Sequence, residues 1–159
     1  MRRFALFLFS LAGVAWAETP GTVELKGSIG YTGFTDESLI HHLQTGASAR
    51  IYVTRRLSVE PEFQYLRQSR RHSDVVIVPN VNWDFREGRV VPYVTGGAGW
   101  VRSEFRRFRP VFTVNEIFWQ AGGGVKLYIT DHWYVAPEAR FGWELHFRAG
   151  AAVGYTFRR

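Results

Sequence analysis

The sequence predicts an all-β protein that folds as an eight-stranded antiparallel up-and-down transmembrane β-barrel. Segments of about ten residues alternate apolar and polar side chains from residue 22 to the end, and a period of two marks a strand with one apolar and one polar face. Long and short connections alternate between these segments, as in a meander of hairpins. No apolar stretch after residue 17 is long enough for a transmembrane helix, so a membrane-spanning form of this chain must be a closed barrel.

The first 17 residues have the features of a secretory signal peptide. Arg2 and Arg3 form a basic start, residues 4–14 are apolar, and residues 15–17, Ala-Trp-Ala, match a cleavage site. The apolar stretch is too short for a membrane anchor. We therefore expect residues 1–17 to be removed and residues 18–159 to form one barrel domain. The chain contains no cysteine, so disulfides do not stabilise the exported domain.

The predicted strands follow one another at short intervals along the rest of the chain. They cover residues 22–31, 44–54, 57–66, 74–84, 90–101, 116–130, 133–143 and 146–157. Short turns are expected at residues 55–56, 86–88 and 131–132. The segment 90–101 fits either phase of alternation, because it is rich in valine, glycine and alanine. For that strand we favour an outward face formed by Pro92, Val94, Ala98 and Trp100.

An internal repeat supports a barrel built from two similar halves. Residues 46–65 and 122–141 align at an offset of 76 residues, which corresponds to four strands. The two segments share small residues, a basic position, a Tyr-x-Thr step, a turn and a Pro-Glu pair. Any two amphipathic hairpins resemble each other to some degree, but the shared Pro-Glu pair favours a true repeat.

Alternation alone leaves open which face points inward, because a soluble lipocalin-like barrel has the opposite arrangement. Long strands and a glycine-rich polar face favour a membrane barrel with a narrow lumen. Aromatic residues also lie near strand ends on the apolar face, as in interfacial girdles: Tyr31, Trp83, Trp100, Trp133, Trp143, Tyr155 and Phe157. The charges on the polar face balance, as a closed interior requires. We expect an ion-pair network in the lumen formed by Glu24, Lys26, Arg50, Glu60, Glu62, Lys126, Glu138, Arg140, Glu144 and Arg148.

The chain is basic, with a formal net charge of +6. Without Arg2 and Arg3, 18 Lys and Arg remain against 14 Asp and Glu. The surplus lies in two loop clusters, composed of Arg67, Arg70, Arg71 and His72, and of Arg102, Arg106, Arg107 and Arg109. Export argues against a nucleic-acid partner. The arginines are candidate contacts for lipopolysaccharide phosphates, with ordinary solvated loop charge as the alternative.

The chain after residue 17 resembles the small eight-stranded outer-membrane barrels of the OmpA-like and OmpX-like kind. The resemblance rests on the signal peptide, on residues 92–100 (PYVTGGAGW) and on residues 154–157 (GYTF). It implies location in the outer membrane and insertion by the barrel assembly machinery, with Tyr155 and Phe157 as the assembly signal on the last strand. Two arginines follow that signal, and Ala152 stands where glycine is usual. The chain lacks the further periplasmic domain of OmpA-type proteins, so anchoring to the cell wall is not expected.

No catalytic, cofactor or metal site is expected. A lipid A deacylase would need a nucleophile, a base and an acid at the outer rim, and the available parts are Ser69, Ser103, His72, His146, Glu104 and Glu144. His146 is followed two residues later by arginine instead of the required serine. His41 and His42 face opposite sides of a strand, which argues against a shared metal.

These observations predict a non-enzymatic barrel, inserted as a monomer with both termini in the periplasm. Its expected role is envelope integrity or surface interaction. The alternatives that the sequence leaves open are a narrow solute channel, a lipid A-modifying barrel enzyme and a soluble periplasmic binding barrel.

Overall fold

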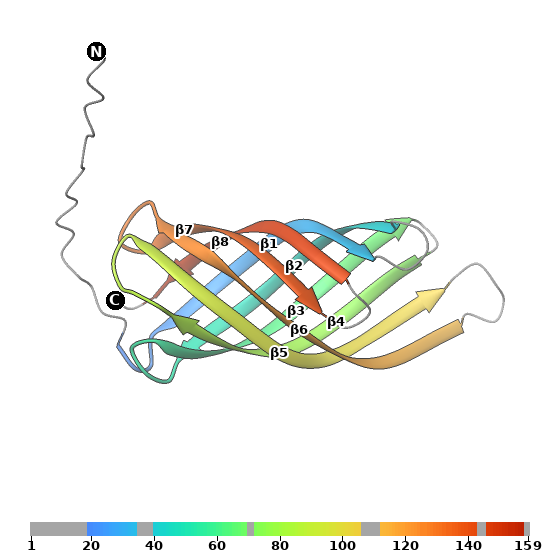
Figure 1. The fold of residues 1–159 in the computed structure, drawn as a ribbon, viewed down its shortest axis with the longest axis horizontal. Helices are drawn as coiled ribbons and strands as arrows, with labels where there is room; N and C mark the ends of the chain where they lie inside the picture. The colour runs from blue at the N-terminus through green and yellow to red at the C-terminus, as the bar shows by residue number, and fades with distance from the viewer. Residues whose placement is uncertain (1–18, 35–39, 70–71, 106–111, 143–145, 158–159) are drawn as a thin grey trace, which may run out of the picture.

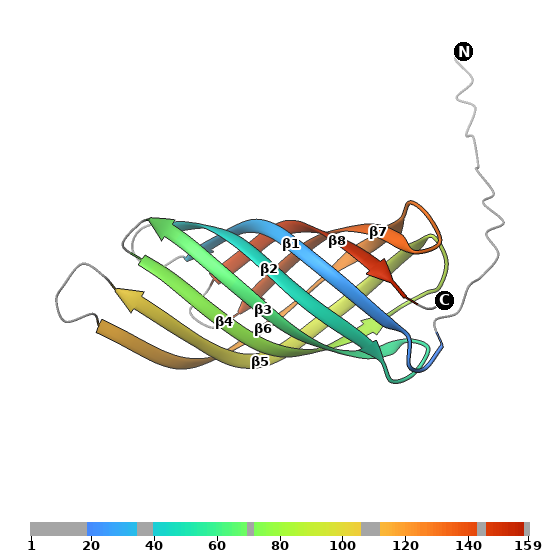
Figure 2. The same ribbon diagram turned by 180° about the vertical axis from the view of Figure 1, so that it is seen from behind.

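The computed structural model describes residues 19–34, 40–69, 72–105, 112–142 and 146–157. They form eight strands that follow one another around a barrel (Figures 1 and 2). The strands are β1 (Val23–Phe34), β2 (Ile40–Tyr52), β3 (Leu57–Ser69), β4 (His72–Asp84), β5 (Val90–Phe105), β6 (Phe112–Tyr128), β7 (Trp133–Gly142) and β8 (His146–Thr156). Within the described residues, no helix is long and apolar enough to cross a bilayer.

Each strand pairs antiparallel with its neighbours in sequence, and β8 pairs with β1 to close the barrel. The closing ladder places Leu25 opposite Tyr155 and Gly30 opposite Gly150. Residues at both ends of the described chain lie at the short-turn end, because Gly21 donates a hydrogen bond to Tyr52 O (2.8 Å) and Phe157 donates one to Val23 O (2.9 Å). The predicted fold class, a closed antiparallel eight-stranded barrel, is confirmed.

The two turns of the internal repeat form the same hydrogen bonds. The Thr54 hydroxyl accepts a hydrogen bond from the backbone N–H of Leu57 (2.9 Å), and the Thr130 hydroxyl accepts one from that of Trp133 (3.0 Å). Such side-chain acceptors satisfy turn N–H groups that the ladder leaves unpaired. The third short turn, between β4 and β5, contains Gly88 at a φ of 114°, a value that favours glycine.

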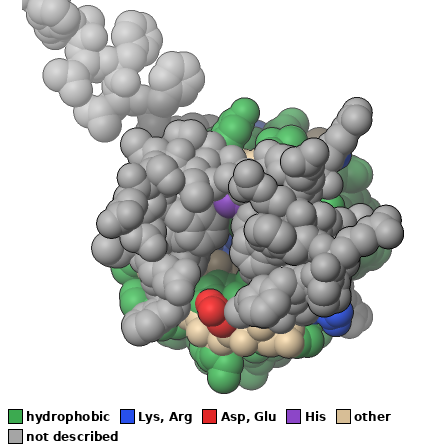
Figure 3. Space-filling model, turned by 90° about the vertical axis from the view of Figure 1, so that its right-hand side faces the viewer, with side chains coloured by type: hydrophobic (Ala, Val, Ile, Leu, Met, Phe, Trp, Pro, Cys, Tyr) green, Lys and Arg blue, Asp and Glu red, His purple; other side chains and the backbone are tan. Residues whose placement is uncertain are grey.

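The apolar side chains point outward. Leu25, Ile29, Phe63, Val81 and Phe141 are all exposed, while most of the alternate residues of the same strands are buried. Viewed from the end opposite the short turns, apolar side chains lie around the outside and a histidine lies near the centre (Figure 3). This arrangement is the reverse of a soluble barrel, whose apolar face encloses the core.

The preferred phase of the fifth strand is confirmed. Val94 and Trp100 are exposed, whereas Val91 and Tyr93 are buried inside the barrel. Aromatic side chains lie near both ends of the outer surface. Tyr31, Tyr65 and Trp100 form an outer girdle near the long-loop end, and Trp83, Trp133 and Phe157 lie near the short turns.

The strands extend beyond the predicted ends on the long-loop side. β5 reaches Phe105 instead of residue 101, and β6 begins at Phe112 instead of residue 116. These residues pair with each other as far as Phe105 opposite Phe112. A hairpin can continue without an apolar stripe, because backbone pairing alone holds the two strands together. The alternation of side chains therefore underestimates the length of these strands.

A glycine makes room for a buried tyrosine near the short-turn end. A Cβ atom on Gly154 of β8 would collide with the phenol ring of Tyr134, which projects from β7 into the lumen. Tyr134 is buried and packs against Tyr128, with a centroid distance of 5.2 Å. The absence of a side chain at Gly154 on β8 thus leaves the space that the Tyr134 ring of β7 occupies.

We expect Gly154→Ala to lower the free energy of unfolding by about 1–3 kcal/mol, because the added methyl group overpacks the lumen. The measurement is a urea titration of the barrel in detergent micelles. Gly27→Ala is the matched control, since a Cβ at Gly27 meets no atom within 4 Å. Equal stability of the two variants would show that Tyr134 moves without cost.

Candidate functional site

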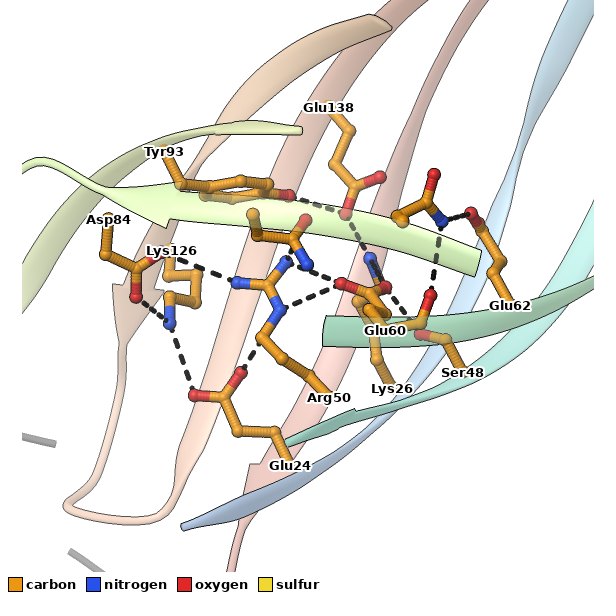
Figure 4. A network of polar contacts seen from close by, with 12 residues as sticks. Glu24, Lys26, Ser48, Arg50, Glu60, Glu62, Asp84, Tyr93, Lys126 and Glu138 are labelled. Carbon is orange, nitrogen blue, oxygen red and sulfur yellow. Dashed lines mark hydrogen bonds and ion pairs between the residues drawn. The ribbon is translucent and has the colours of Figure 1, made fainter. Parts of the chain in front are cut away.

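A buried lysine joins four strands at the short-turn end of the lumen. Lys126 Nζ lies 2.8 Å from Asp84 Oδ2 and 3.2 Å from Glu24 Oε1 (Figure 4). It also donates a hydrogen bond to the Tyr52 hydroxyl. The ammonium group lies 5.2 Å from the centroid of the Tyr52 ring and 5.7 Å from that of Tyr134. Carboxylates and aromatic faces therefore surround this cation in place of water.

Glu24, which contacts the same lysine, also accepts hydrogen bonds from tyrosine hydroxyls. Its two carboxylate oxygens accept hydrogen bonds from Tyr128 (3.0 Å) and Tyr134 (3.1 Å). Arg50 Nε lies 3.9 Å from Glu24 Oε2. A buried carboxylate is stable only when its lone pairs are satisfied in this way.

The middle of the lumen holds three linked ion pairs. Arg50 Nη2 lies 2.8 Å from Glu60 Oε2, and Lys26 Nζ lies 2.7 Å from Glu60 Oε1. Lys26 Nζ also lies 2.7 Å from Glu138 Oε1, so it bridges carboxylates on β3 and β7 (Figure 4). The Tyr93 hydroxyl donates to Glu138 Oε1 at 2.6 Å.

Two arginines, Arg140 and Arg148, lie toward the long-loop end. Glu62 accepts hydrogen bonds from Arg140 Nη1 (2.7 Å) and from Arg148 Nη2 (2.9 Å). Arg140 Nη2 also donates to Glu138 Oε2 at 2.9 Å. Glu138 thereby connects these arginines to Lys26, and the contacts form one continuous chain along the lumen.

This chain of contacts, the lumen network, ties all eight strands together. Its five cations and five carboxylates are all buried: Lys26, Arg50, Lys126, Arg140, Arg148, Glu24, Glu60, Glu62, Asp84 and Glu138. Tyr93 adds β5 through its contact with Glu138. Since each cation has at least one carboxylate within 4.0 Å, charge is balanced locally as well as in total. Such an arrangement links the strands of the barrel wall to one another from the inside.

The structure places nine of the ten predicted lumen residues inside the barrel, in contact with one another. Glu144, the tenth, lies outside the described residues. The prediction omitted Asp84, although it falls in phase with Asn80 and Asn82 on β4. It also omitted the buried tyrosines, of which Tyr128 falls in phase with Lys126 and Tyr134 with Glu138. Tyrosine counts as apolar in an alternation pattern, but its hydroxyl makes it a lumen residue here.

The predicted outer contacts are described only in part. Arg67 on β3 and Arg102 on β5 are exposed, and each lies two residues beyond an aromatic of the outer girdle, Tyr65 or Trp100. Alternation therefore puts these arginines on the outward face, on the loop side of the girdle. The remaining arginines of the two clusters, Arg70, Arg71, Arg106, Arg107 and Arg109, lie outside the described residues.

The residues considered for catalysis lie beyond what the structure describes, either wholly (Glu144) or for their side chains (Ser69, His72, Ser103, Glu104 and His146). Among the described side chains, no group of three His, Cys, Asp or Glu residues could hold a metal ion. His42 is buried on the lumen face, with its Nε2 atom 3.9 Å from Asp74 Oδ2.

The predicted assembly signal forms part of an aromatic cluster at the end of β8. The Tyr155 ring lies 5.0 Å from the ring centroids of both Trp133 and Phe157, in edge-on orientations. It also stacks on His132 at 5.6 Å. The cluster faces outward near the short turns.

A closed barrel with an apolar outer surface, aromatic girdles and a charged interior defines a transmembrane β-barrel protein. Residues 4–157 match the family described as outer membrane protein beta-barrel domain, and the chain belongs to that family. It is a protein of the outer membrane, and its apolar surface contacts the lipid there.

Solved structures share this fold at low sequence identity. The alignment with the N-terminal β-barrel domain of OprF from Pseudomonas aeruginosa covers 88% of this chain and 100% of the OprF domain. The sequence identity is 14% and the TM-score is 0.73. The alignment with Neisserial surface protein A covers 87% of this chain and 98% of that protein, at 12% identity and a TM-score of 0.72. A third structure is that of Ail, the attachment invasion locus protein of Yersinia pestis, in complex with the heparin analogue sucrose octasulfate. Its alignment covers 87% of this chain and 100% of Ail, at 12% identity and a TM-score of 0.67. No curated protein sequence matches this chain.

We expect Glu138→Ala to lower the free energy of unfolding by roughly 3–5 kcal/mol, because it leaves Lys26 and Arg140 with one carboxylate fewer in a closed interior. The measurement is an unfolding titration in detergent, with Glu87→Ala in an exterior turn as the control. In a double-mutant cycle, Lys26→Ala combined with Glu138→Ala should cost less than the sum of the single changes. An unchanged stability of Glu138→Ala would rule out a stabilising lumen network.

Proposed function

We propose that this protein is a non-enzymatic outer-membrane barrel that contributes to envelope integrity or surface interaction. The observation that carries this proposal is the continuous chain of buried ion pairs along the lumen. Arg140 of β7 pairs with Glu62 of β3, four strands away around the ring, and Lys126 of β6 pairs with Glu24 of β1. Charged side chains from opposite walls therefore meet in the interior. A solute would have to displace these groups to pass.

The lumen network acts as a structural element in this proposal. An eight-stranded barrel is narrow enough for side chains to fill its interior. Removing one partner of a buried pair is costly because the other charge remains without compensation. The network thus favours one cross-section of the barrel over others and supports a rigid wall in the membrane.

Arg67 and Arg102 are proposed contacts for lipopolysaccharide phosphates at the outer surface. A guanidinium group binds phosphate with two parallel hydrogen bonds. Both residues lie just beyond the outer girdle, at the depth where headgroups begin. The structure of Ail with sucrose octasulfate, a polyanion, provides a precedent for anion binding on a barrel of this fold. Arg70, Arg71, Arg106, Arg107 and Arg109 extend the basic character of the same loops.

The proposal also covers export of the protein and its insertion into the outer membrane. The first 17 residues direct export and are removed, and the barrel assembly machinery recognises the last strand through Tyr155 and Phe157. Closure between β8 and β1 leaves the barrel complete within one chain, which favours insertion as a monomer.

The proposal predicts no discrete conductance steps when the purified barrel is reconstituted in a planar lipid bilayer, because the lumen network fills the interior. The unboiled protein should migrate differently from the boiled protein in a gel, as a detergent-resistant barrel does. The Glu62→Gln/Glu138→Gln double variant tests whether the network is the barrier, and we expect it to admit ions. Steps of unitary conductance from the unsubstituted protein would instead indicate a channel, and a mass shift of lipid A on expression would indicate an enzyme.

The Arg67→Gln/Arg102→Gln double variant should bind lipopolysaccharide at least several-fold more weakly, since each guanidinium group contributes a charge-assisted contact. Binding is measured with the barrel in detergent micelles at low salt, where the loss is largest. Arg55→Gln/Arg56→Gln at the opposite end of the barrel is the matched control, because it removes the same charge. Equal losses in both double variants would mean that only net charge matters.

A further inference from the structure

Proline interrupts three of the strand ladders in the barrel wall. Pairing between β2 and β3 is interrupted for two residues on each strand beside Pro61. The same gap occurs between β4 and β5 beside Pro79, and between β6 and β7 beside Pro137. These three ladders belong to the hairpins with short turns (Figure 1). Within the described residues the other ladders contain no such gap, although the register shifts near the outer end of β3.

Each proline directs its nitrogen at the interrupted ladder. Leu57 O of β3 accepts a hydrogen bond from the Val53 N–H at the end of β2. Alternate residues of a strand direct their backbone groups to the same side, so Pro61 also faces β2. The hydrogen bonds at the other two short turns, traced in the same way, direct Pro79 toward β5 and Pro137 toward β6. Because proline has no N–H, it cannot complete the ladder at these points.

The carbonyl groups opposite the prolines therefore lack a ladder donor. The register on either side of each gap places Ala49, Ala98 and Val125 opposite the three prolines. The prolines lie on the outward face between the two aromatic girdles. Hydrocarbon at that depth offers no replacement for a hydrogen bond. Proline within a paired strand is accordingly rare, and its presence in all three short-turn hairpins calls for a physical reason.

The reason lies in the state of the chain before insertion. A chain that reaches the outer membrane first passes through water, where strands with one apolar face and unpaired edges aggregate. β4 contains four consecutive β-branched residues, Val75–Val78, and Pro79 follows them directly. Proline is effective at breaking such a segment, because it stops the addition of further backbone pairs.

Pairing in each hairpin grows outward from the turn and meets the proline. In the hairpin of β2 and β3, the ladder between the turn and the gap consists of residues 51–52 paired with 58–59. A two-stranded hairpin is at best marginally stable in water. Ordering the backbone at the gap costs conformational entropy, and one of the two hydrogen bonds that would offset this cost cannot form. Pairing in water thus stops close to the turn.

The finished barrel holds the gap closed by contacts that the free hairpin lacks. Beside Pro61, the gap residues Arg50 and Glu60 form an ion pair of 2.8 Å inside the lumen. Both side chains are buried. Such a pair contributes little when it is exposed to water, and its attraction grows in an interior of low dielectric constant. Uninterrupted ladders to β1 and β4 hold the outer sides of the same hairpin.

We propose that Pro61, Pro79 and Pro137 delay complete pairing of the three short-turn hairpins until the chain enters the membrane. The first pairs beside each turn form in water, and pairing stops at mid-strand. The chain therefore stays soluble and competent for insertion, while the finished barrel has one ladder bond fewer in each of these hairpins. Pro61 and Pro137 occupy equivalent positions of the internal repeat, so both halves carry this element. The proposal does not depend on the proposed function.

The test compares the unsubstituted chain with the Pro61→Val/Pro137→Val double variant, which restores two backbone N–H groups. Each chain is unfolded in urea and diluted into vesicles of dilauroylphosphatidylcholine. The folded fraction is read from the gel shift between unboiled and boiled samples. Ala47→Val/Ala139→Val is the matched control, because it adds β-branched side chains at outward positions of the same two hairpins and restores no N–H. Stability is measured separately, by urea titration of protein folded in detergent micelles.

We expect the proline double variant to fold with a yield at least about twofold lower, because paired hairpins aggregate before insertion. Its folded form should unfold at an equal or higher urea concentration than the unsubstituted barrel. Diluted without vesicles, it should show more β-structure by circular dichroism. Pro137→Val alone, which restores one N–H, should give an intermediate yield. The alanine-to-valine control should keep the yield of the unsubstituted chain.

An unchanged or higher yield of the proline variants would overturn the proposal, since the prolines would then be ladder defects only. A lower yield combined with unfolding at a lower urea concentration would also overturn it, because the prolines would then stabilise the folded wall. An equal loss of yield in the control would assign the effect to the added side chains and not to the N–H groups, with the same consequence. The conductance and lipopolysaccharide measurements use folded protein, so the proposals fail separately.

Discussion

The structure depends on one constraint, which is that hydrocarbon offers no hydrogen bonds. Every backbone group at membrane depth must find its partner in the chain, and closure of β8 onto β1 achieves this around the whole circumference. The same constraint turns the apolar side chains outward, because lipid is the solvent there. Polar and charged residues are then confined to a lumen too narrow for bulk water, and they must satisfy one another. The ion pairs of the interior are therefore a consequence of the outer surface.

Within that lumen the network is organised around carboxylates that serve two or more cations. Glu138 meets Lys26, Arg140 and Arg148, and Glu24 meets Lys126 and Arg50. Tyrosines supply the remaining donors, and their rings occupy volume that would otherwise hold water. Because the partners of each group come from different strands, deforming the wall at one point separates charges at several others. Rigidity and electrical balance thus have the same physical origin.

The sequence predicted the fold and most of the charged interior, because alternation with a period of two reports directly on the two faces of a strand. The strand starts after the short turns were also predictable: β3, β5 and β7 begin at residues 57, 90 and 133, as the turns indicated. β2 and β6, which lead into two of these turns, end at residues 52 and 128, two residues before their predicted ends. The long-loop ends were not, because residues 102–105 and 112–115 are held by backbone pairing and need no apolar stripe. Tyr134 was missed because tyrosine counts as apolar, and its fit against Gly154 of the neighbouring strand was not predictable either. A contact of that kind is set by register between strands, which alternation along one strand does not contain.

The matching turns at Thr54 and Thr130 bear on how the barrel comes together. Each turn has its own hydrogen bonds and joins strands that are adjacent in sequence, so the hairpins can form locally and early. The ladder between β1 and β8 is different, because it brings Glu24 opposite Thr156, at the far end of the chain, and it carries most of the entropy of ring closure. Until that ladder forms, both terminal strands present an unpaired edge along their full length. An unclosed barrel is for this reason the species that lipid tolerates least, and entry into the membrane and closure of the ring have to proceed together.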